Sequence, residues 1–375
     1  MSARATNEKR GEKIEDQVIR SVRFDKRHSK IAHNASDVVV LGDSRFLFCD
    51  NNVNSALFEL RPSSAGSLAR PIVSHPIRGV RPEAIDDMEC MTKAVVDGEH
   101  LLFISSSLSL QKNGKLRKKS RRGKLSAARE SLLRMRVSPN GKPEAEIIPC
   151  FRAWLVENAP VLSKAAKRLP DEGGLNVEGL AWDPTQSMLL FGLRTPTKNG
   201  RPVVLRVQVG DPTGIWNLSN LQMSRPVTLA IKGEGEQGIR AITWDVSRKV
   251  FLVLVGNAIS GKKTPFALYS WDGNTRGIVH KFEHVRFHKK MRPEGITHGT
   301  IGGRGVVLFV DDNGGYQFLW DTDPRLRREA ATTVRAAART VARGRAKATV
   351  RTRAVRARTV RVTRRASAAR ARARA

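Results

Sequence analysis

The sequence predicts an all-β protein built as a single β-propeller. A five-residue pattern occurs four times. Its first position is charged (Glu in three copies, Arg in one), its second is small or short, and its third is aliphatic. Its fourth position is Ala or Thr, and its fifth is a large residue. The last three copies are spaced by 62 and 54 residues, which suits four-stranded blades with their loops. The copies are Glu89-Cys-Met-Thr-Lys93, Glu178-Gly-Leu-Ala-Trp182, Arg240-Ala-Ile-Thr-Trp244 and Glu294-Gly-Ile-Thr-His298.

A strongly apolar segment follows each copy after about ten residues and predicts the second strand of each unit. These segments are Leu101–Ser105, Met188–Leu193, Val250–Val255 and Gly305–Val310. An amino-terminal variant of the unit starts at Asp37-Val-Val-Val and continues with Arg45–Cys49. Further β-like stretches, such as Val203–Val207 and Phe266–Trp271, add outer strands. We therefore expect five blades, with six as the alternative.

The last unit contains only three strand candidates, ending at Tyr316–Trp320. The alternating segment Val18–Phe24 is a candidate for the missing strand, because closure by the opposite terminus protects free sheet edges. The predicted propeller thus spans residues 18–323, after a flexible N-terminus of residues 1–17.

Two insertions interrupt the repeats. Residues 112–124 contain eight basic residues and no acid, which predicts a solvated loop between two strands. Residues 151–168 place Trp154, Leu155, Val161 and Leu162 at helical spacing around Pro160, which predicts one or two short helices covering a sheet edge.

The C-terminal residues 324–375 consist almost entirely of Ala, Arg, Thr and Val. From Arg325 onward they hold 17 arginines, one lysine and one acid, about half of the formal net charge of +32. Such a composition predicts a disordered basic tail, since it offers too little apolar surface to form a core. A tail of this kind binds nucleic acid without sequence preference and in a salt-dependent way, or it has no selected role.

The three cysteines, Cys49, Cys90 and Cys150, form no CxxC pair, and the first 21 residues contain no apolar leader segment. The longest apolar run, Val250–Val255, is too short to span a membrane. These observations predict a cytoplasmic protein with reduced thiols. We also expect the protein to be a monomer.

Three segments resemble a known family. "LNVEGLAWD…LLFGLRTP…GRPVVLRV", "GIRAITWD…LVLVGNA" and "RPEGITHG…VVLFVDD" are similar to bacterial domain-of-unknown-function family 3616, over roughly Asp37 to Trp320. The resemblance implies a propeller-like fold and no particular reaction. The "EG-aliphatic" strand starts are also similar, more distantly, to phytase-like and lactonase-like propellers, which implies calcium at the axis.

The first residues of the repeats predict the site. In a propeller the inner strands start at one mouth of the axial channel, beside the ends of the second strands. Acidic and basic residues from distant parts of the chain should therefore meet there. These residues are Glu89, Glu178, Arg240 and Glu294 on inner strands and Asp50, Arg194, Asn257 and Asp311 on second strands.

Three interpretations of this ring remain open. It can be an internal salt-bridge network, a site for a small anionic ligand or a divalent cation such as Ca²⁺, or the site of a metal-dependent ester, lactone or phosphate hydrolase. In the second and third interpretations, the candidate metal ligands are Glu89, Glu178, Glu294 and Asp311. The candidate ligand-binding residues are Asp50, Arg194, Arg240 and Asn257. Glu178, Glu294 and His298 are the candidate catalytic residues. A protein-interaction scaffold and a nucleic-acid-associated protein are the alternative functions.

Overall fold

The computed structural model describes residues 18–24, 34–119, 125–137, 144–231, 235–259 and 264–326. These residues form five four-stranded antiparallel sheets and one two-stranded sheet. Blade 1 contains β2 (Ala35–Gly42), β3 (Arg45–Asp50), β4 (Val53–Leu60) and β5 (Val73–Pro76). Blade 2 contains β6 (Met88–Val96), β7 (Glu99–Ser106), β10 (Leu132–Arg136) and β11 (Glu144–Ile148). Blade 3 contains β12 (Asn176–Asp183), β13 (Met188–Thr195), β14 (Val203–Val209) and β15 (Leu221–Thr228). Blade 4 contains β16 (Gln237–Asp245), β17 (Val250–Asn257), β18 (Ala267–Trp271) and β19 (Val279–Lys281).

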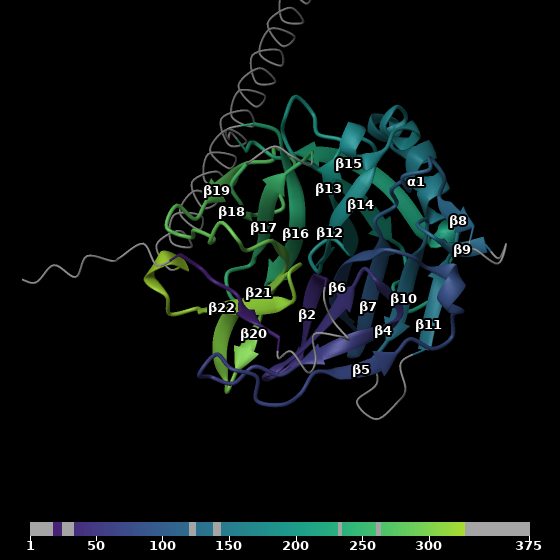
Figure 1. Cartoon of the computed structure of the whole chain (residues 1–375). Coiled ribbons are helices and arrows are strands. Elements are labelled where there is room, and N and C mark those ends of the chain that lie inside the picture. Colours follow the sequence, from purple (N-terminus) through teal and green to yellow (C-terminus); the bar gives the residue numbers. More distant parts are fainter. Residues whose placement is uncertain are drawn as a thin grey trace, which may run out of the picture. The chain divides into compact units, whose positions relative to one another are not determined.

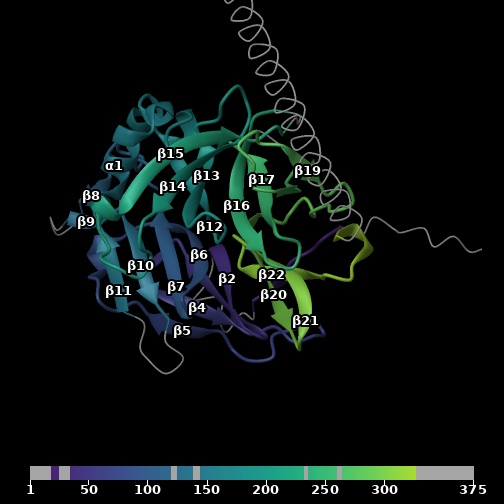
Figure 2. The same cartoon turned by 180° about the vertical axis from the view of Figure 1, so that it is seen from behind.

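Blade 5 contains β20 (Pro293–Ile301), β21 (Arg304–Asp311), β22 (Gly315–Trp320) and the amino-terminal β1 (Val22–Arg23). The first strands of the five blades, β2, β6, β12, β16 and β20, contact one another in turn and surround a common axis (Figures 1 and 2). The structure is therefore a five-bladed β-propeller, as predicted. Each predicted strand start and second strand lies inside the corresponding observed strand.

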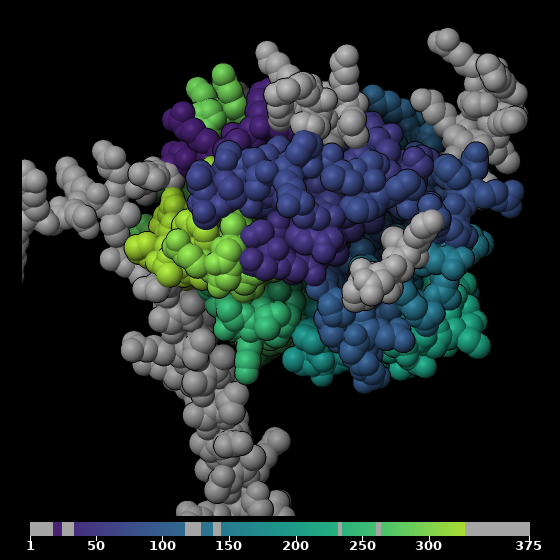
Figure 3. Space-filling view, turned by 90° about the horizontal axis from the view of Figure 1, so that it is seen from below, coloured from purple at the N-terminus to yellow at the C-terminus, as the bar shows by residue number. Residues whose placement is uncertain are grey.

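The ring is closed by the amino-terminal segment, again as predicted. Val22 pairs with Tyr316 and Arg23 with Gly315, in antiparallel register with β22. Phe24 then stacks on Phe48 of blade 1, with 5.4 Å between ring centroids. Figure 3 shows the yellow-green end of the described chain beside the purple strands of blade 1. Strand β1 thus covers the free edge of the last blade and links the last blade to the first.

The hydrophobic core is divided among the contacts between neighbouring blades. The five clusters of buried apolar residues each join two adjacent sheets: blades 1 and 2, 2 and 3, 3 and 4, 4 and 5, and 5 and 1. A sheet covered on both faces needs apolar residues at consecutive positions, because successive side chains point to opposite faces. This explains continuous runs such as Val250–Val255, all of which are buried.

The insertion at residues 151–168 is helical, as predicted. It contains α1 (Phe151–Asn158), η2 (Pro160–Leu162) and η3 (Ala165–Lys167), followed by η4 (Pro170–Glu172). Phe151 and Leu155 are fully buried in the cluster between blades 2 and 3, so α1 covers that interface. Two further short helices lie within the described ranges, η1 (Pro82–Ala84) and η5 (Leu218–Asn220).

The predicted basic loop at residues 112–124 is more ordered than expected over its described part. Arg117–Lys119 form β8, which pairs with β9 (Leu125–Ala128) as a separate hairpin, and residues 120–124 lie outside the described residues. The prediction overlooked this hairpin because a basic segment carries little hydrophobic alternation.

The packed part of the chain extends slightly beyond the predicted boundary at residue 323. Leu326 is fully buried in the cluster between blades 4 and 5. The predicted N-terminal segment of residues 1–17 and the basic tail from residue 327 onward lie outside the described residues. Among the residues that are described, no helix is both long and apolar enough to cross a membrane.

Candidate functional site

A β-bulge occurs near the start of every inner strand, at one residue of each blade. In each case the register shifts across a single residue that has no cross-strand partner. Such a bulge bends the strand locally and re-aims the side chain of the extra residue. The bulge residues are Ser36, Glu89, Glu178, Arg240 and Glu294.

The predicted alignment of the repeats holds for four of these five positions. In blade 1 the bulge residue is Ser36, and Asp37 pairs with Cys49 at the following position. The buried Asp37 carboxylate instead accepts the backbone N–H groups of Val38 (2.8 Å) and Met91 (2.9 Å), which links blade 1 to blade 2. Burial raises the pKa of Asp37 well above its ordinary value.

Arg194 reaches the ring through a second irregularity. Asn176 pairs with Thr195 and Val177 with Leu193, so Arg194 is an extra residue in β13 and Thr195 ends the strand. A Cβ atom at Gly238 would lie 2.2 Å from the backbone oxygen of Arg194, so this glycine permits the close approach of blade 4.

Four charged residues of the ring form a continuous ion-pair chain. Arg194 Nη1 lies 2.8 Å from Glu178 Oε1, and Arg240 Nη1 lies 2.8 Å from Glu178 Oε2. The other terminal nitrogen of Arg240 contacts Glu294 Oε1. Glu178, Arg240 and Glu294 are all buried, and they come from blades 3, 4 and 5. The structure therefore brings together the predicted residues Glu178, Arg194, Arg240 and Glu294.

The two arginines occupy different environments. The charge of Glu178 raises the pKa of Arg194, whereas burial lowers the pKa of Arg240. Arg194 Nε also donates to the backbone oxygens of Asn257 (3.3 Å) and Ala258 (3.0 Å). Both guanidinium groups are thus engaged by the protein, and Arg194, with 19% of its side chain exposed, is the more accessible.

Glu89 differs from the other ring carboxyl groups. Its Oε1 atom accepts a hydrogen bond from Asn51 Nδ2 at 3.2 Å, and among the described residues no arginine or lysine forms an ion pair with it. Burial, together with the negative charges of Asp87 and Glu178, raises the pKa of Glu89 well above its ordinary value. Glu89 is also only partly buried. It is therefore the ring carboxyl group most available for proton transfer.

The predicted residues at the ends of the second strands brace the adjoining loops. Asp50 accepts the backbone N–H of Asn52 at 2.8 Å, and Asn257 Oδ1 accepts that of Thr264 at 2.5 Å. Asp311 Oδ1 accepts the N–H of Asn313 at 3.0 Å, while its Oδ2 accepts the hydroxyl of Ser21 at 2.5 Å.

The predicted divalent cation stays a prediction. The guanidinium of Arg240 lies between Glu178 and Glu294, so a cation bound by both carboxylates would have to displace it. Over the described ranges, no three His, Cys, Asp or Glu side chains are grouped so that they could hold a metal ion. The four residues predicted as metal ligands therefore do not form a ready-made site in this arrangement.

Two buried amide oxygens at the same mouth lack a donor within the described part of the chain. They are Asn176 Oδ1 and Gln237 Oε1, from the first residues of β12 and β16. The nitrogen of the Asn176 amide donates to Glu178 Oε1 at 3.0 Å, which fixes its oxygen in the opposite direction. Buried acceptors of this kind are costly unless a water molecule or a ligand donates to them. Sequence reasoning missed Gln237, because the repeat pattern began three residues later.

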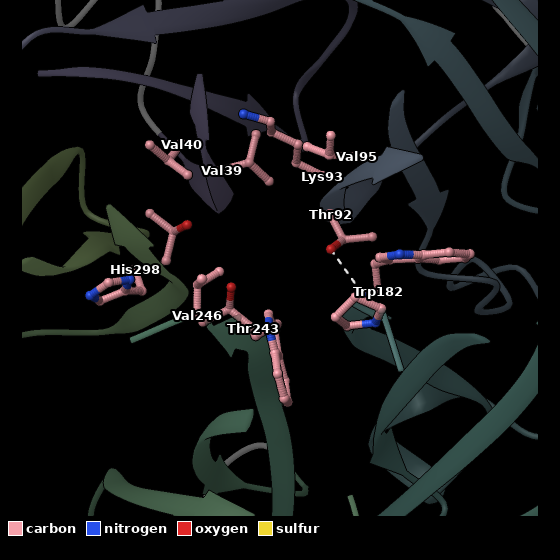
Figure 4. Close-up of a pocket in the computed structure, with 12 residues that line it drawn as sticks. Val39, Val40, Thr92, Lys93, Val95, Trp182, Thr243, Val246 and His298 are labelled. Atoms are coloured by element: carbon pink, nitrogen blue, oxygen red, sulfur yellow. Dashed lines mark hydrogen bonds between the residues drawn. The ribbon is translucent and has the colours of Figure 1, made fainter. Parts of the chain in front are cut away.

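The opposite mouth of the channel contains a pocket of about 330 Å³, which sequence reasoning did not predict. It is lined mainly by the fourth and fifth residues of the same five-residue pattern, so each repeat contributes to both mouths. Figure 4 shows these side chains around the cavity, with Lys93 extending from β6 toward Val39 of β2. The fourth and fifth residues that line the pocket are Val39, Val40, Thr92, Lys93, Trp182, Thr243, Trp244, Thr297 and His298.

His298 lies at this second mouth, away from Glu178 and Glu294 at the other ends of the inner strands. Its Nε2 is 2.8 Å from Asp321 Oδ2, and its Nδ1 is 3.7 Å from Asp245 Oδ1. Both ring nitrogens thus face carboxylates that fix the imidazole. The structure does not bring the three predicted catalytic residues together.

The fold and the two mouths define a five-bladed β-propeller with a charged ring at one end of its axis and a pocket at the other. No protein-family model matches the chain, and no curated protein matches it.

A comparison with solved structures matches the chain to the GH43 protein BlXynB of Bacillus licheniformis, with 8% identity, a TM-score of 0.41 and coverage of 77% of this chain. The chain spans 52% of the length of that protein. For an α-L-arabinofuranosidase from Lactobacillus brevis the identity is 9%, the TM-score 0.45, and the coverage 77% of this chain and 91% of the other. For the glutaminyl cyclase of Myxococcus xanthus the identity is 12% and the TM-score 0.39, and the match covers 81% of this chain and 94% of the other. At such values none of these proteins identifies an activity or a ligand for this chain.

Proposed function

We propose that the charged mouth of the channel binds a small polar ligand and hydrolyses an ester or lactone bond in it. One observation carries the proposal: Glu89 is a partly buried carboxyl group with a raised pKa and, among the described residues, no ion-pair partner. A carboxyl group with a raised pKa holds its proton to higher pH than an ordinary one and is a stronger base once deprotonated, which suits it to general acid–base catalysis.

In this proposal Glu89 acts as the general base. Its deprotonated carboxylate takes a proton from a water molecule while the water oxygen attacks the acyl carbon of the substrate. The carbon–oxygen bond to the leaving alkoxide then breaks, and the proton passes from Glu89 to that alkoxide. The products are a carboxylic acid and an alcohol, or a hydroxy acid from a lactone.

The remaining ring residues supply charge and orientation. Arg194 is the more exposed guanidinium and would stabilise the oxyanion that forms on the acyl oxygen. The oxygens of Asn176 and Gln237 would accept hydrogen bonds from hydroxyl groups of the ligand. Glu178 and Glu294 hold Arg240 in place and are positioning residues rather than catalytic ones.

The pairing of both arginines modifies the anionic-ligand prediction at this mouth. A guanidinium that already binds a carboxylate offers less to an incoming phosphate or carboxylate than a free one does. We therefore favour neutral esters and lactones over phosphate esters. The predicted Ca²⁺ stays a separate hypothesis for this mouth, and the hydrolysis proposed here does not depend on it, because both carboxylate oxygens of Glu178 already face arginines.

Turnover of p-nitrophenyl acetate and of a set of γ- and δ-lactones tests the proposal, with and without added calcium. Glu89→Gln should reduce kcat by about a hundredfold or more, since general base catalysis contributes about 10²–10⁴ in rate. Glu157→Gln, an exposed glutamate on α1, is the matched control and should retain full activity. The proposal is wrong if the wild-type protein turns over none of these substrates under either condition, or if Glu89→Gln is as active as the control.

A further inference from the structure

The pocket at the second mouth is lined by one lysine, Lys93, at the fifth position of the repeat pattern. The other four blades carry an uncharged residue, or a histidine held by carboxylates, at this position. At the fifth position of the pattern, blades 3 and 4 carry Trp182 and Trp244, and blade 1 carries Val40. Blade 5 carries His298, whose imidazole faces Asp245 and Asp321. Blade 2 carries Lys93, which lines the same cavity.

The ammonium group of Lys93 has no counter-charge within the described part of the chain. No hydrogen bond or ion pair joins it to any of the described residues, although the side chain is partly buried. Burial lowers the pKa of Lys93 below its ordinary value. Placing a cation in a largely apolar cavity without a partner costs stability, and an anionic ligand would remove that cost.

The rest of the wall suits an apolar ligand body with one further polar atom. Val39, Val40 and Val246 present aliphatic surface, and the indole of Trp244 packs against Phe251 at 4.9 Å between ring centroids. The hydroxyl of Thr243 points toward the cavity (Figure 4), and no described residue accepts or donates a hydrogen bond to it. Thr92 is already engaged, because its hydroxyl accepts the backbone N–H of Trp182 at 3.0 Å.

We propose that this pocket binds a small organic carboxylate with a branched aliphatic or aromatic body. The carboxylate pairs with Lys93, and the body lies against the valines and Trp244. The volume of about 330 Å³ is at the small end of ligand pockets, which excludes large ligands. The positive charge of Lys93, which has no ion-pair partner among the described residues, excludes cationic ligands. This site is independent of the hydrolytic function proposed for the other mouth.

Isothermal titration calorimetry with benzoate, phenylacetate and 4-methylpentanoate tests the proposal, with the corresponding amide of each as a neutral control. The wild-type protein should bind at least one carboxylate about tenfold more tightly than its amide, since an ion pair in an apolar pocket discriminates charge. Lys93→Met should remove this preference. Lys164→Met, an exposed lysine in the helical insertion, should leave it unchanged.

Two further variants locate the site and separate the two mouths. Thr243→Phe fills the cavity from a different blade and should abolish binding of every probe, while circular dichroism confirms that the protein is folded. Glu89→Gln should leave carboxylate binding unchanged. Any one of four results would overturn the proposal. They are equal affinity of the wild-type protein for carboxylates and amides, an unchanged preference in Lys93→Met, unchanged binding in Thr243→Phe, and no binding of any probe at millimolar concentration.

Discussion

The guanidinium of Arg240 lies 2.8 Å from the carboxylate of Glu178, a residue of the neighbouring blade. Through its other terminal nitrogen Arg240 also reaches Glu294 of the blade on its opposite side. One side chain thus joins three consecutive blades at the axis. At this mouth blades 3, 4 and 5 are linked by ion pairs in addition to the apolar packing between their sheets.

Replacing Arg240 by methionine should destabilise the protein by about 3–5 kcal/mol, because Glu178 and Glu294 would remain buried without the charge between them. Urea unfolding measures this loss. The exposed Arg225→Met should change stability by less than about 0.5 kcal/mol. Adding Glu294→Gln to Arg240→Met should recover part of the loss, since it removes one stranded carboxylate. A loss below about 1 kcal/mol in Arg240→Met would show that the chain of ion pairs contributes little.

The raised pKa of Glu89 predicts a specific pH dependence of stability. Between its ordinary pKa of 4.5 and its higher value in the folded protein, the folded state binds more protons at this site than the unfolded state does. The free energy of unfolding therefore falls as the pH rises through this window. Glu89→Gln cannot titrate and should lack this contribution.

Urea unfolding of the wild-type protein and of Glu89→Gln at several pH values from 4 to 8 measures the effect. The variant should become more stable relative to the wild type as the pH increases, and the difference should level off above the raised pKa. Glu157→Gln is again the control and should follow the wild type at every pH. A difference that is constant with pH would mean that the pKa of Glu89 is not raised.

The repeat pattern allowed the number of blades and the position of each inner strand to be predicted, because both depend on hydrophobic periodicity and spacing. It also located Glu89, Glu178, Arg240 and Glu294 at one mouth. The position of Arg194 required more information, since the extra residue in β13 is an irregularity of register that a single sequence does not reveal.

The pocket and the pairing of individual charges could not be predicted for a different reason. Lys93 falls at a repeat position occupied elsewhere by Trp182 and Trp244, and whether such a side chain finds a partner depends on the blades beside it. Likewise, Glu89 and Glu178 are equivalent in sequence, yet only Glu178 faces two arginines. These differences arise from contacts between sheets, which lie far apart along the chain.

Lys93→Met should stabilise the ligand-free protein. The substitution keeps most of the apolar stem and removes an ammonium group that has no partner among the described residues, so we expect a gain of about 1 kcal/mol. Thermal unfolding measures the gain, and Lys164→Met should show none. A destabilised Lys93→Met would indicate that the lysine supports the fold. A variant that is more stable than the wild type and no longer distinguishes carboxylates from amides would identify Lys93 as a binding residue.

Phe24 should be essential for ring closure, although it lies only one residue beyond the short strand β1. Its side chain is 4% exposed and packs against Phe48 of blade 1, while Val22 of the same segment is 39% exposed. Phe24→Ala should therefore cost about 3–5 kcal/mol through lost burial and the cavity it leaves, and Val22→Ala less than about 0.5 kcal/mol. Because loosening this segment exposes the edge of β22, Phe24→Ala should also aggregate at a lower temperature than the wild type. Urea unfolding and light scattering during heating measure the two effects, and equal stability of the two variants would show that the ring is closed without this contact.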